Sequence, residues 1–575
     1  MYSLGEYKKA IKNRDGKGKI IRIAIVGDNA TQFLTTSIQG EAILRGYNPE
    51  MYEADYNQVE MQVMDPNSDL HNFKADYTII YQSTNKLLER HSLLDYTEQE
   101  RLADDRLDFV KTICEQLKGR IIYYNYPEID DAVFGSFSSK VRTSFNYQLC
   151  KLNLGLMKLS QQHQNLFICN ISGIQAKMGR DVMFAPSVYV NTEMVLSIDS
   201  LPYVASRTMD IISAAEGQIK KCLILDLDNT LWGGVVGDDG WEGIQIGHGL
   251  GIGKAFTEFQ QWIKKLKNRG IILAICSKNF EDKAKEPFEN NPEMVLKLND
   301  IAVFIANWNN KVDNIRTIQR ILNIGFDSMV FLDDNPFERN MVRENIPDIS
   351  VPELPEDPSE YLEYLYSLNL FETASYSEGD KDRTKQYQVE AQRVSFQKSF
   401  SNEEDYLKSL NMVSEIKDFD KFNIPRVAQL SQRSNQFNLR TVRYTEDEIT
   451  DIENDDDYAK FSFTLKDKFG DNGLVCVIIM KKIDESTLFI DTWFMSCRVL
   501  KRGMENFTLN TIVDWAQRNG YKNIIGEYLP TLKNGMVANH YANLGFKKME
   551  GTATDRFILD VTNYEPKVCF INGKD

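Results

Sequence analysis

The chain has 575 residues, 42% of them hydrophobic and 26% charged, and a formal net charge of −16 at pH 7. This length allows about three to five domains, and the apolar content is high enough for packed cores, which excludes general disorder. The acidic balance excludes nucleic acids and anionic membranes as partners, because binding to either requires a basic face.

The amino-terminal residues, MYSLGEYKKAIKNRDGKGK, contain no apolar run long enough for a signal peptide, and no window of the sequence approaches a membrane-spanning helix. The eight cysteines form no C-x-x-C pair, and Cys222, Cys276 and Cys476 lie in apolar runs that predict core positions. This pattern indicates neither a disulfide framework nor a zinc site. We therefore expect a cytoplasmic protein.

Residues 1–215 are expected to form the first module. The segment IRIAIVGDNATQF (21–33) predicts a strand and a turn, and it resembles the first block of SGNH-type esterases, in which a serine nucleophile follows G-D. Asn29 stands in the place of that serine, and the closing D-x-x-H is missing, because Asp199 is followed by Ser-Leu-Pro. Without a serine or a histidine, acyl-enzyme chemistry has no nucleophile and no base. The resemblance implies a three-layer, doubly wound, flavodoxin-like module without catalytic activity. Its expected role is to bind a ligand or to cover an active site as a lid, and the alternative is an active hydrolase.

Residues 216–355 alternate short apolar runs with amphipathic patterns, which predicts a Rossmann-like domain with a doubly wound parallel sheet. The expected strands are 222–225, 271–276, 301–306 and 328–332, and the expected helices are 254–269, 282–290 and 311–323. Polar groups follow three of these strands, and Lys311 begins the helix after the remaining one. Because open α/β sheets bind ligands at the carboxyl ends of their strands, these groups are expected to meet there.

The sequence LDLDNTL (225–231) contains D-x-D-x-T, formed by Asp226, Asp228 and Thr230, and resembles the first motif of the haloacid dehalogenase (HAD) phosphotransferases. The resemblance implies that Asp226 is the nucleophile that forms an aspartyl phosphate and that Asp228 is the general acid and base. The residues expected to bind the substrate are Thr230, Ser277 and Lys311. Those expected to hold Mg²⁺ are Asp226, the backbone carbonyl of Asp228, Asp333 and Asp334, and which of the last two contacts the metal directly is open.

HAD enzymes with small substrates usually have a cap domain, but core helices fill both stretches in which this chain could insert one. The glycine-rich residues 232–251 resemble only the short hairpin flap of the superfamily. The resemblance therefore implies a capless, open site. Its substrate is expected to be macromolecular or to be covered by another domain of the chain.

Residues 356–412 are expected to form a helical linker, and residues 413–575 an α+β domain. The pattern predicts strands at 475–479 and 488–494 and an amphipathic helix at 505–518. HYANLGF (540–546) resembles the last acyl-binding motif of GNAT-type acetyltransferases. Of the phosphate loop of that fold only Gly503 matches, so the binding of coenzyme A is open.

The whole arrangement resembles the FkbH-like family, on four segments: LDLDNTLWGGVVGDDG (225–240), FLDDNPFERNMVRE (331–344), NQFNLRTVRY (435–444) and MSCRVLKRGME (495–505). The family combines a degenerate SGNH-like module, a capless HAD domain and a GNAT-like domain. The resemblance implies that phosphate is removed from a phosphoglycerate and that the acyl group is loaded onto an acyl carrier protein through a cysteine thioester. The cysteine at the matching position is Cys497, and the alternative is a buried cysteine at the end of a strand.

Arg498, Lys501 and Arg502 favour the thiolate of Cys497 if they face it, and His540 is either a base or a packing residue. We expect a Mg²⁺-dependent HAD phosphatase or phosphotransferase that acts on a carrier-bound or carrier-destined hydroxyacyl phosphate. The alternatives are a stand-alone phosphatase of a sugar or metabolite phosphate, and a scaffold that recruits a carrier protein with a vestigial active site. Hydrolysis of a generic aryl phosphate would exclude the scaffold.

Overall fold

The structure is a computed structural model that describes residues 2–376, 380–381, 383–531 and 533–574. Contacts divide the chain into two compact units, residues 1–213 and 214–575. Part of the predicted helical linker, residues 377–379 and 382, lies outside the described residues. Among the described residues, no helix has the length and hydropathy needed to cross a bilayer.

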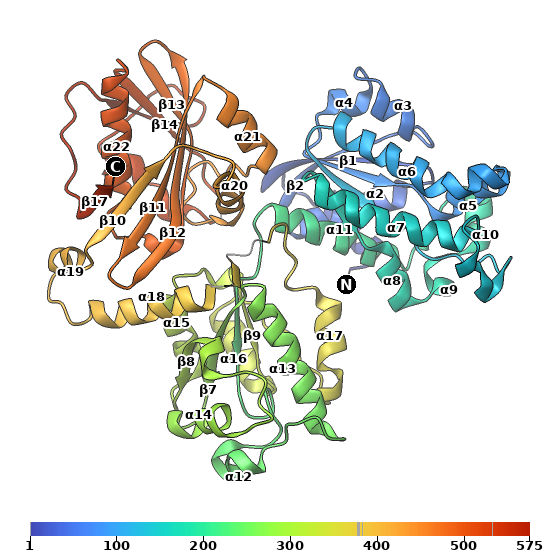
Figure 1. Ribbon diagram of the computed structural model, residues 1–575, viewed down its shortest axis with the longest axis horizontal. Coiled ribbons are helices and arrows are strands. Elements are labelled where there is room, and N and C mark those ends of the chain that lie inside the picture. Colours follow the sequence, from blue (N-terminus) through green and yellow to red (C-terminus); the bar gives the residue numbers. More distant parts are fainter. Residues whose placement is uncertain (1, 377–379, 382, 532, 575) are drawn as a thin grey trace. The chain divides into compact units, whose positions relative to one another are not determined.

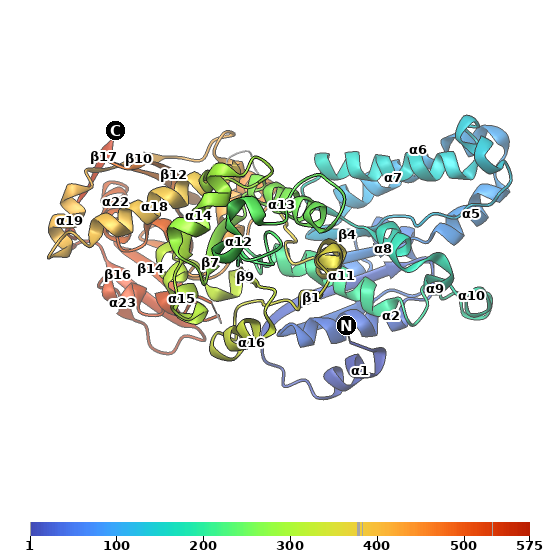
Figure 2. The same ribbon diagram turned by 90° about the horizontal axis from the view of Figure 1, so that it is seen from below.

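The first unit is a three-layer α/β module with helices on both faces of one parallel sheet (Figure 1), and its strands run in the order β2-β1-β3-β4-β5. The strands are β1 (Lys19–Gly27), β2 (Tyr47–Glu53), β3 (Tyr77–Tyr81), β4 (Arg120–Tyr124) and β5 (Leu166–Cys169). The helices are α1 (Leu4–Lys12), α2 (Gln32–Leu44), α3 (Val59–Met64), α4 (Asp69–Phe73), α5 (Thr84–Leu93), α6 (Tyr96–Gln116), α7 (Phe145–Gln162), α8 (Ile171–Met178), α9 (Arg180–Met183), α10 (Pro186–Thr192) and α11 (Leu201–Ala215). The long helices α6 and α7 pack side by side (Figure 2).

The strand order of this sheet reverses between β1 and β3, which is where doubly wound sheets bind ligands. Asp28 and Asn29 lie there, buried, and are hydrogen-bonded to each other and to their surroundings. The Asn29 side-chain amide donates to Asp28 Oδ1 over 3.1 Å, and the Ser83 N–H donates to the same oxygen over 2.8 Å. Burial raises the pKa of Asp28, although both hydrogen bonds oppose this. Asn29 thus occupies the expected nucleophile position as a buried, hydrogen-bonded amide.

We expect the full chain to release no p-nitrophenol from p-nitrophenyl acetate through this module, because an amide cannot replace the missing nucleophile. The measurement is the burst and steady rate of wild type against Asn29→Ala. A burst that disappears in Asn29→Ala would show that the module is an active hydrolase.

The second unit begins with a four-stranded parallel sheet in the order β8-β7-β6-β9, which we call the core sheet. Its strands are β6 (Cys222–Leu225), β7 (Ile272–Ser277), β8 (Ile301–Ala306) and β9 (Met329–Leu332). The helices of this region are α12 (Val236–Gly243), α13 (Ile252–Asn268), α14 (Glu281–Asn290), α15 (Lys311–Leu322) and α16 (Pro336–Asn345). All four strands lie within one residue of their predicted positions.

Successive residues of β6 face opposite layers of helices. Leu223 and Leu225 share a hydrophobic cluster with Phe259 of α13, whereas Cys222 and Ile224 share one with Ile315 of α15. Because both faces are covered, the strands are short, continuous apolar runs. This packing holds the carboxyl ends of the strands at one edge of the core sheet.

The predicted helical linker contains α17 (Tyr361–Leu368), α18 (Arg383–Gln397) and α19 (Glu403–Ser409). These helices are packed parts of the second unit rather than a spacer. Tyr361 of α17 is buried in the cluster beside α13, and Tyr387 of α18 is buried in the cluster beside α15. Tyr406 of α19 belongs to the core of the carboxyl-terminal sheet.

The carboxyl-terminal sheet is mixed, in the order β15-β16-β14-β13-β12-β11-β10-β17, and α22 packs along it (Figure 1). Its strands are β10 (Met412–Lys417), β11 (Tyr458–Asp467), β12 (Gly470–Asp484), β13 (Thr487–Met495), β14 (Asn523–Tyr528), β15 (Lys547–Lys548), β16 (Asp555–Asp560) and β17 (Ile571–Lys574). Its helices are α20 (Ile424–Arg433), α21 (Glu446–Asn454), α22 (Met504–Arg518) and α23 (His540–Asn543). The predicted strands 475–479 and 488–494 and the predicted helix 505–518 lie inside β12, β13 and α22.

Two neighbouring strands of this sheet, β13 and β14, separate along their length. They pair only from Thr487 to Phe489 and from Asn523 to Ile525. Residues 437–439 lie in the resulting gap: the Leu439 N–H donates to the Trp493 oxygen over 3.3 Å, and the Leu529 N–H donates to the Leu439 oxygen over 3.0 Å. The segment therefore forms backbone hydrogen bonds with both sides of the gap.

Candidate functional site

Three carboxylates meet at the carboxyl end of the core sheet, where the strand order reverses between β6 and β9. Asp226 follows β6 directly, and Asp333 and Asp334 follow β9. One oxygen of each lies within 4.8 Å of those of the other two. Asp226 is 6% exposed and Asp333 is fully buried. We call these three residues the carboxylate cluster.

Lys311, the first residue of α15, is a buried cation beside the carboxylate cluster. Its Nζ lies 2.8 Å from Asp226 Oδ2 and 2.5 Å from Asp333 Oδ2. Burial alone lowers the pKa of Lys311, but the two carboxylates outweigh burial and raise it. Burial and the charge of Asp226 raise the pKa of Asp333 to about 7, against the effect of Lys311.

The carboxylate cluster has the composition of a site for a hard divalent cation. Asp226 Oδ1 is buried and has no hydrogen-bond partner among the described residues. Three carboxylates beside one ammonium group leave an excess of negative charge, which is unfavourable in a buried place without a cation. Carboxylate oxygens are the ligands that Mg²⁺ prefers, so the residues present fit this ion. Both Asp333 and Asp334 offer an oxygen, so the choice between them stays open.

We expect Lys311→Met to lower the free energy of unfolding of the metal-free protein by about 3 kcal/mol, because it leaves Asp226 and Asp333 without a buried partner. Urea unfolding in EDTA, followed by tryptophan fluorescence, measures this loss, since all six tryptophans lie in residues 214–575. The control is Lys265→Met at an exposed position of α13. Equal stabilities of the two variants would contradict the role of Lys311.

Asp228 lies apart from the carboxylate cluster and is fixed by three donors. Its Oδ1 accepts from Trp232 Nε1 and from the Val236 N–H, each over 3.0 Å, and its Oδ2 accepts from Asn279 Nδ2 over 2.9 Å. A carboxyl group held in one position by hydrogen bonds meets the geometric requirement for general acid and base catalysis. Asn279 was not predicted, because its place two residues after Ser277 does not by itself show that its side chain reaches Asp228.

The other expected phosphate-binding residues lie at the same edge. Ser277 is the last residue of β7 and is 1% exposed, and its Oγ accepts from Asn279 over 3.3 Å. Thr230 is fully buried, and its Oγ1 accepts from the Asp334 N–H over 3.1 Å. Thr230 therefore joins the loop after β6 to the loop after β9, and its contact with substrate stays a prediction.

The segment 232–251, predicted as a flap, is closed at its base by a pair of hydrogen bonds. The Gly233 N–H donates to the Gln245 oxygen over 3.0 Å, and the Gln245 N–H donates to the Gly233 oxygen over 2.7 Å. The helix α12 lies between Gly233 and Gln245 in the chain. The stretches in which a cap domain would be inserted are occupied by α13, α14 and β8.

Three exposed aromatic side chains, two on loops and one in the first turn of α16, follow or precede residues of the site, and none of them was predicted. Phe280, Trp308 and Phe337 are 67%, 61% and 68% exposed, and each lies three residues from Ser277, Lys311 or Asp334. The rings of Phe280 and Trp308 are 5.6 Å apart. A cap domain would cover such side chains. The local sequence around each residue does not show whether one is present, so their exposure could not be predicted. We call these three side chains the aromatic rim.

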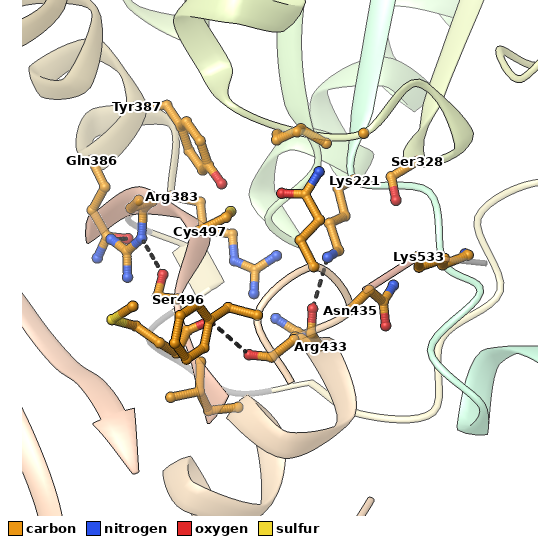
Figure 3. Close-up of a pocket in the computed structure, with 18 of the residues that line it drawn as sticks. Lys221, Ser328, Arg383, Gln386, Tyr387, Arg433, Asn435, Ser496, Cys497 and Lys533 are labelled. Carbon is orange, nitrogen blue, oxygen red and sulfur yellow. Dashed lines mark hydrogen bonds between the residues drawn. The ribbon is translucent and has the colours of Figure 1, made fainter. Parts of the chain in front are cut away.

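Cys497 lies away from the carboxylate cluster. It follows β13 and lines a cavity of about 530 Å³, which Lys221 also lines (Figure 3). Lys221 precedes β6 and Asp226 follows it, so extended chain of about 16 Å separates them. Cys497 therefore lies near the amino ends of the strands of the core sheet, and the carboxylate cluster lies at their carboxyl ends. We call these the two opposite edges of the core sheet.

The basic residues near Cys497 differ in part from those predicted. Arg498 lines the cavity, whereas Lys501 and Arg502 are not among its lining residues. Arg502 pairs with Asp467 over 3.1 Å and with Glu390 over 2.6 Å, because these buried carboxylates need a cation. Lys221, which is distant in sequence, lines the cavity instead.

His540 is a packing residue in the carboxyl-terminal domain. It is 8% exposed, and its ring centroid lies 4.6 Å from that of Trp493 and 4.9 Å from that of Phe437. Burial lowers the pKa of His540 to about 3. An imidazole with so low a pKa is a weak base, and its Nε2 has no hydrogen-bond partner among the described residues, so the packing alternative fits this environment.

Comparisons with known proteins identify a family model and a solved structure that are similar to this chain. Residues 22–213 match a family model described as FkbH, N-terminal domain. The crystal structure of the N-terminal part of the protein BF1531 from Bacteroides fragilis, containing a phosphatase domain complexed with Mg, is 68% identical to this chain. The match covers 65% of this chain and 100% of that chain, with a TM-score of 0.64.

Two acetyltransferase structures are much less similar to this chain. The ribosomal-protein-S18-alanine N-acetyltransferase from Escherichia coli is 14% identical over 27% of this chain and 99% of its own, with a TM-score of 0.21. The spermidine N-acetyltransferase from Vibrio cholerae, in complex with CoA and spermine, is 13% identical over 26% of this chain and 96% of its own, with a TM-score of 0.21. No curated protein sequence matches the chain. Because the chain covers the whole of a relative with 68% identity and its first unit matches the FkbH model, it belongs to the FkbH-like family.

Proposed function

We propose that the chain is a Mg²⁺-dependent phosphatase or phosphotransferase that works through an aspartyl phosphate on Asp226. The observation that carries this proposal is the carboxylate cluster, in which a buried oxygen of Asp226 has no hydrogen-bond partner among the described residues while Lys311 contacts the other oxygen. The Mg-bound phosphatase domain of the Bacteroides fragilis relative supports the same assignment.

Each residue of the site has its own role in the proposed reaction. Bound Mg²⁺ supplies the charge that screens the carboxylate of Asp226 from the phosphate it attacks. Asp226 displaces the leaving group at phosphorus, and Asp228, held by Trp232 and Asn279, gives that group a proton and later takes one from the attacking water. Ser277 and Lys311 hold the oxygens of the transferred phosphoryl group by hydrogen bond and charge.

Phosphate release from p-nitrophenyl phosphate tests the metal requirement. We expect activity with Mg²⁺ and a loss of at least about 10³-fold in EDTA, because removing the ion leaves the repulsion between carboxylate and phosphate unscreened. Beryllofluoride or vanadate should raise the melting temperature only when Mg²⁺ is present. Activity that survives EDTA would contradict the proposal, and activity with Mg²⁺ would exclude the vestigial scaffold.

We further propose that the substrate is the acyl phosphate of a hydroxy acid related to phosphoglycerate. The Cys497 thiolate displaces phosphate from the acyl carbon and forms a thioester, and the thiol of an acyl carrier protein then takes the acyl group and releases Cys497. A thiol lining a cavity, with Arg498 beside it, supports this role. The aromatic rim supports a macromolecular partner, because exposed apolar side chains around an open site are typical of interaction surfaces. If carrier loading fails while phosphate release remains, the stand-alone phosphatase takes its place.

A further inference from the structure

Basic residues outnumber acidic ones among the residues that line the cavity beside Cys497. The basic residues that line it are Lys221, Arg383, Arg426, Arg433, Arg498 and Lys533. The acidic residues that line it are Asp327, Asp348 and Asp380. Two of these are already paired: Asp327 lies 2.6 Å from Lys533, and Asp380 lies 2.9 Å from Arg383 and 2.5 Å from Arg433. The third, Asp348, is exposed to solvent.

Three of the cations have neutral hydrogen-bond partners and, in the described part of the chain, no ion pair. Lys221 Nζ donates to the Arg433 backbone oxygen over 2.8 Å, Arg498 donates to the Gln386 side chain over 2.5 Å, and Arg426 donates to the Gln429 side chain. Burial lowers the pKa of Lys221 to about 8 and that of Arg426 to about 9. Buried cations of this kind are stabilised by an anion that enters the cavity.

The cavity has the size of a small-molecule site and contains a thiol. Its volume of about 530 Å³ lies in the range of metabolite pockets. Tyr387 and Cys497 both line it, and Figure 3 shows these two side chains around the same cavity as Lys221 and Arg433. An anion held by the three cations would therefore lie beside the sulfur atom.

We propose that this cavity binds the phosphate group of an organic phosphate through Lys221, Arg426 and Arg498, next to the Cys497 thiol. It is a second anion site, at the opposite edge of the core sheet from the carboxylate cluster. The proposal adds a ligand site to the acyl-loading function proposed above. It depends on that function only for the role given to the Cys497 thiol. The phosphate belongs either to a phosphorylated hydroxy acid or to the phosphopantetheine arm of a carrier.

The first test compares alkylation by anionic iodoacetate and neutral iodoacetamide on the full chain in EDTA, with peptide mapping. The ratio of the two rates at Cys497 should exceed the ratio at the exposed Cys150 by at least about tenfold, because the cavity concentrates anions. Arg498→Gln should bring the ratio down towards that of Cys150. The control Arg518→Gln, at a side chain that is 76% exposed, should leave it unchanged. Equal ratios at the two cysteines would overturn the proposal.

The second test measures protection of Cys497 from iodoacetamide by 3-phosphoglycerate, by phosphopantetheine and by glycerate. Protection by one of the two phosphates identifies the source, and Arg426→Gln should raise the half-protecting concentration at least tenfold. Protection by glycerate at the same concentration, or by none of the three, would refute phosphate binding. Because this assay contains no Mg²⁺, its result is independent of whether the chain hydrolyses p-nitrophenyl phosphate. The melting temperature of each variant reports on its folding.

Discussion

Asp226→Asn should lower Mg²⁺-dependent phosphate release by at least about 10³-fold, a rise of ~4 kcal/mol in the activation barrier. The amide cannot form the covalent bond to phosphorus that the carboxylate forms, and it offers the metal one less charge. The fold should survive, because one fewer carboxylate beside Asp333 and Asp334 reduces the repulsion within the cluster. Steady-state hydrolysis of p-nitrophenyl phosphate and thermal unfolding in EDTA measure the two effects.

The matched control is Asp282→Asn, the same change at an exposed position of α14. It should keep the activity of wild type. Turnover by Asp226→Asn within about tenfold of wild type, a difference of only ~1.4 kcal/mol, would rule out Asp226 as the nucleophile.

Cys497→Ala should abolish acyl transfer to a carrier protein and leave the hydrolysis of small aryl phosphates near that of wild type. The reason is spatial: Cys497 shares a cavity with Lys221, which precedes β6, whereas the carboxylate cluster lies after the other end of this strand, and about 16 Å of extended chain separates Lys221 from Asp226. Intact-mass analysis of the carrier after incubation with candidate phosphoglycerates detects loading, and p-nitrophenyl phosphate reports on the other site.

A companion variant, Cys150→Ser, removes the exposed thiol and should load the carrier as wild type does. Full loading by Cys497→Ala would leave Cys497 as a residue of the cavity wall without a covalent role. Loss of both activities in Cys497→Ala would mean instead that the two sites depend on each other.

The core sheet could be predicted closely from the sequence, because its strands are buried on both faces and so appear as short apolar runs. The same runs end in Asp226, Ser277 and Asp333, and parallel strands bring such ends together. Lys311 could be placed for a related reason, since it begins the helix after β8. The supporting residue Asn279 could not, because its value depends on the distance to Asp228, which only the folded loops define.

The surroundings of Cys497 were harder to predict, because they are made by segments far apart in the chain. Arg502 is close to Cys497 in sequence, yet the buried carboxylates of Asp467 and Glu390 hold it elsewhere. Lys221 lines the cavity and lies just before β6. The predicted site residues begin at Asp226, after the other end of this strand, so the sequence analysis assigned no role to Lys221. A pattern of local charges therefore predicted a cationic site but not the residues that form it.

The segment that lies between β13 and β14 affects two places in the carboxyl-terminal domain. An unpaired gap in a sheet is a place where an extended ligand can add as a strand, and residues 437–439 occupy it with the chain's own backbone. The residues just before them, Ser434, Asn435 and Gln436, form part of the wall of the Cys497 cavity. One segment of the chain thus fills the gap between the two strands and also forms part of the wall of the cavity. Substitutions that loosen this peptide should disturb both places together.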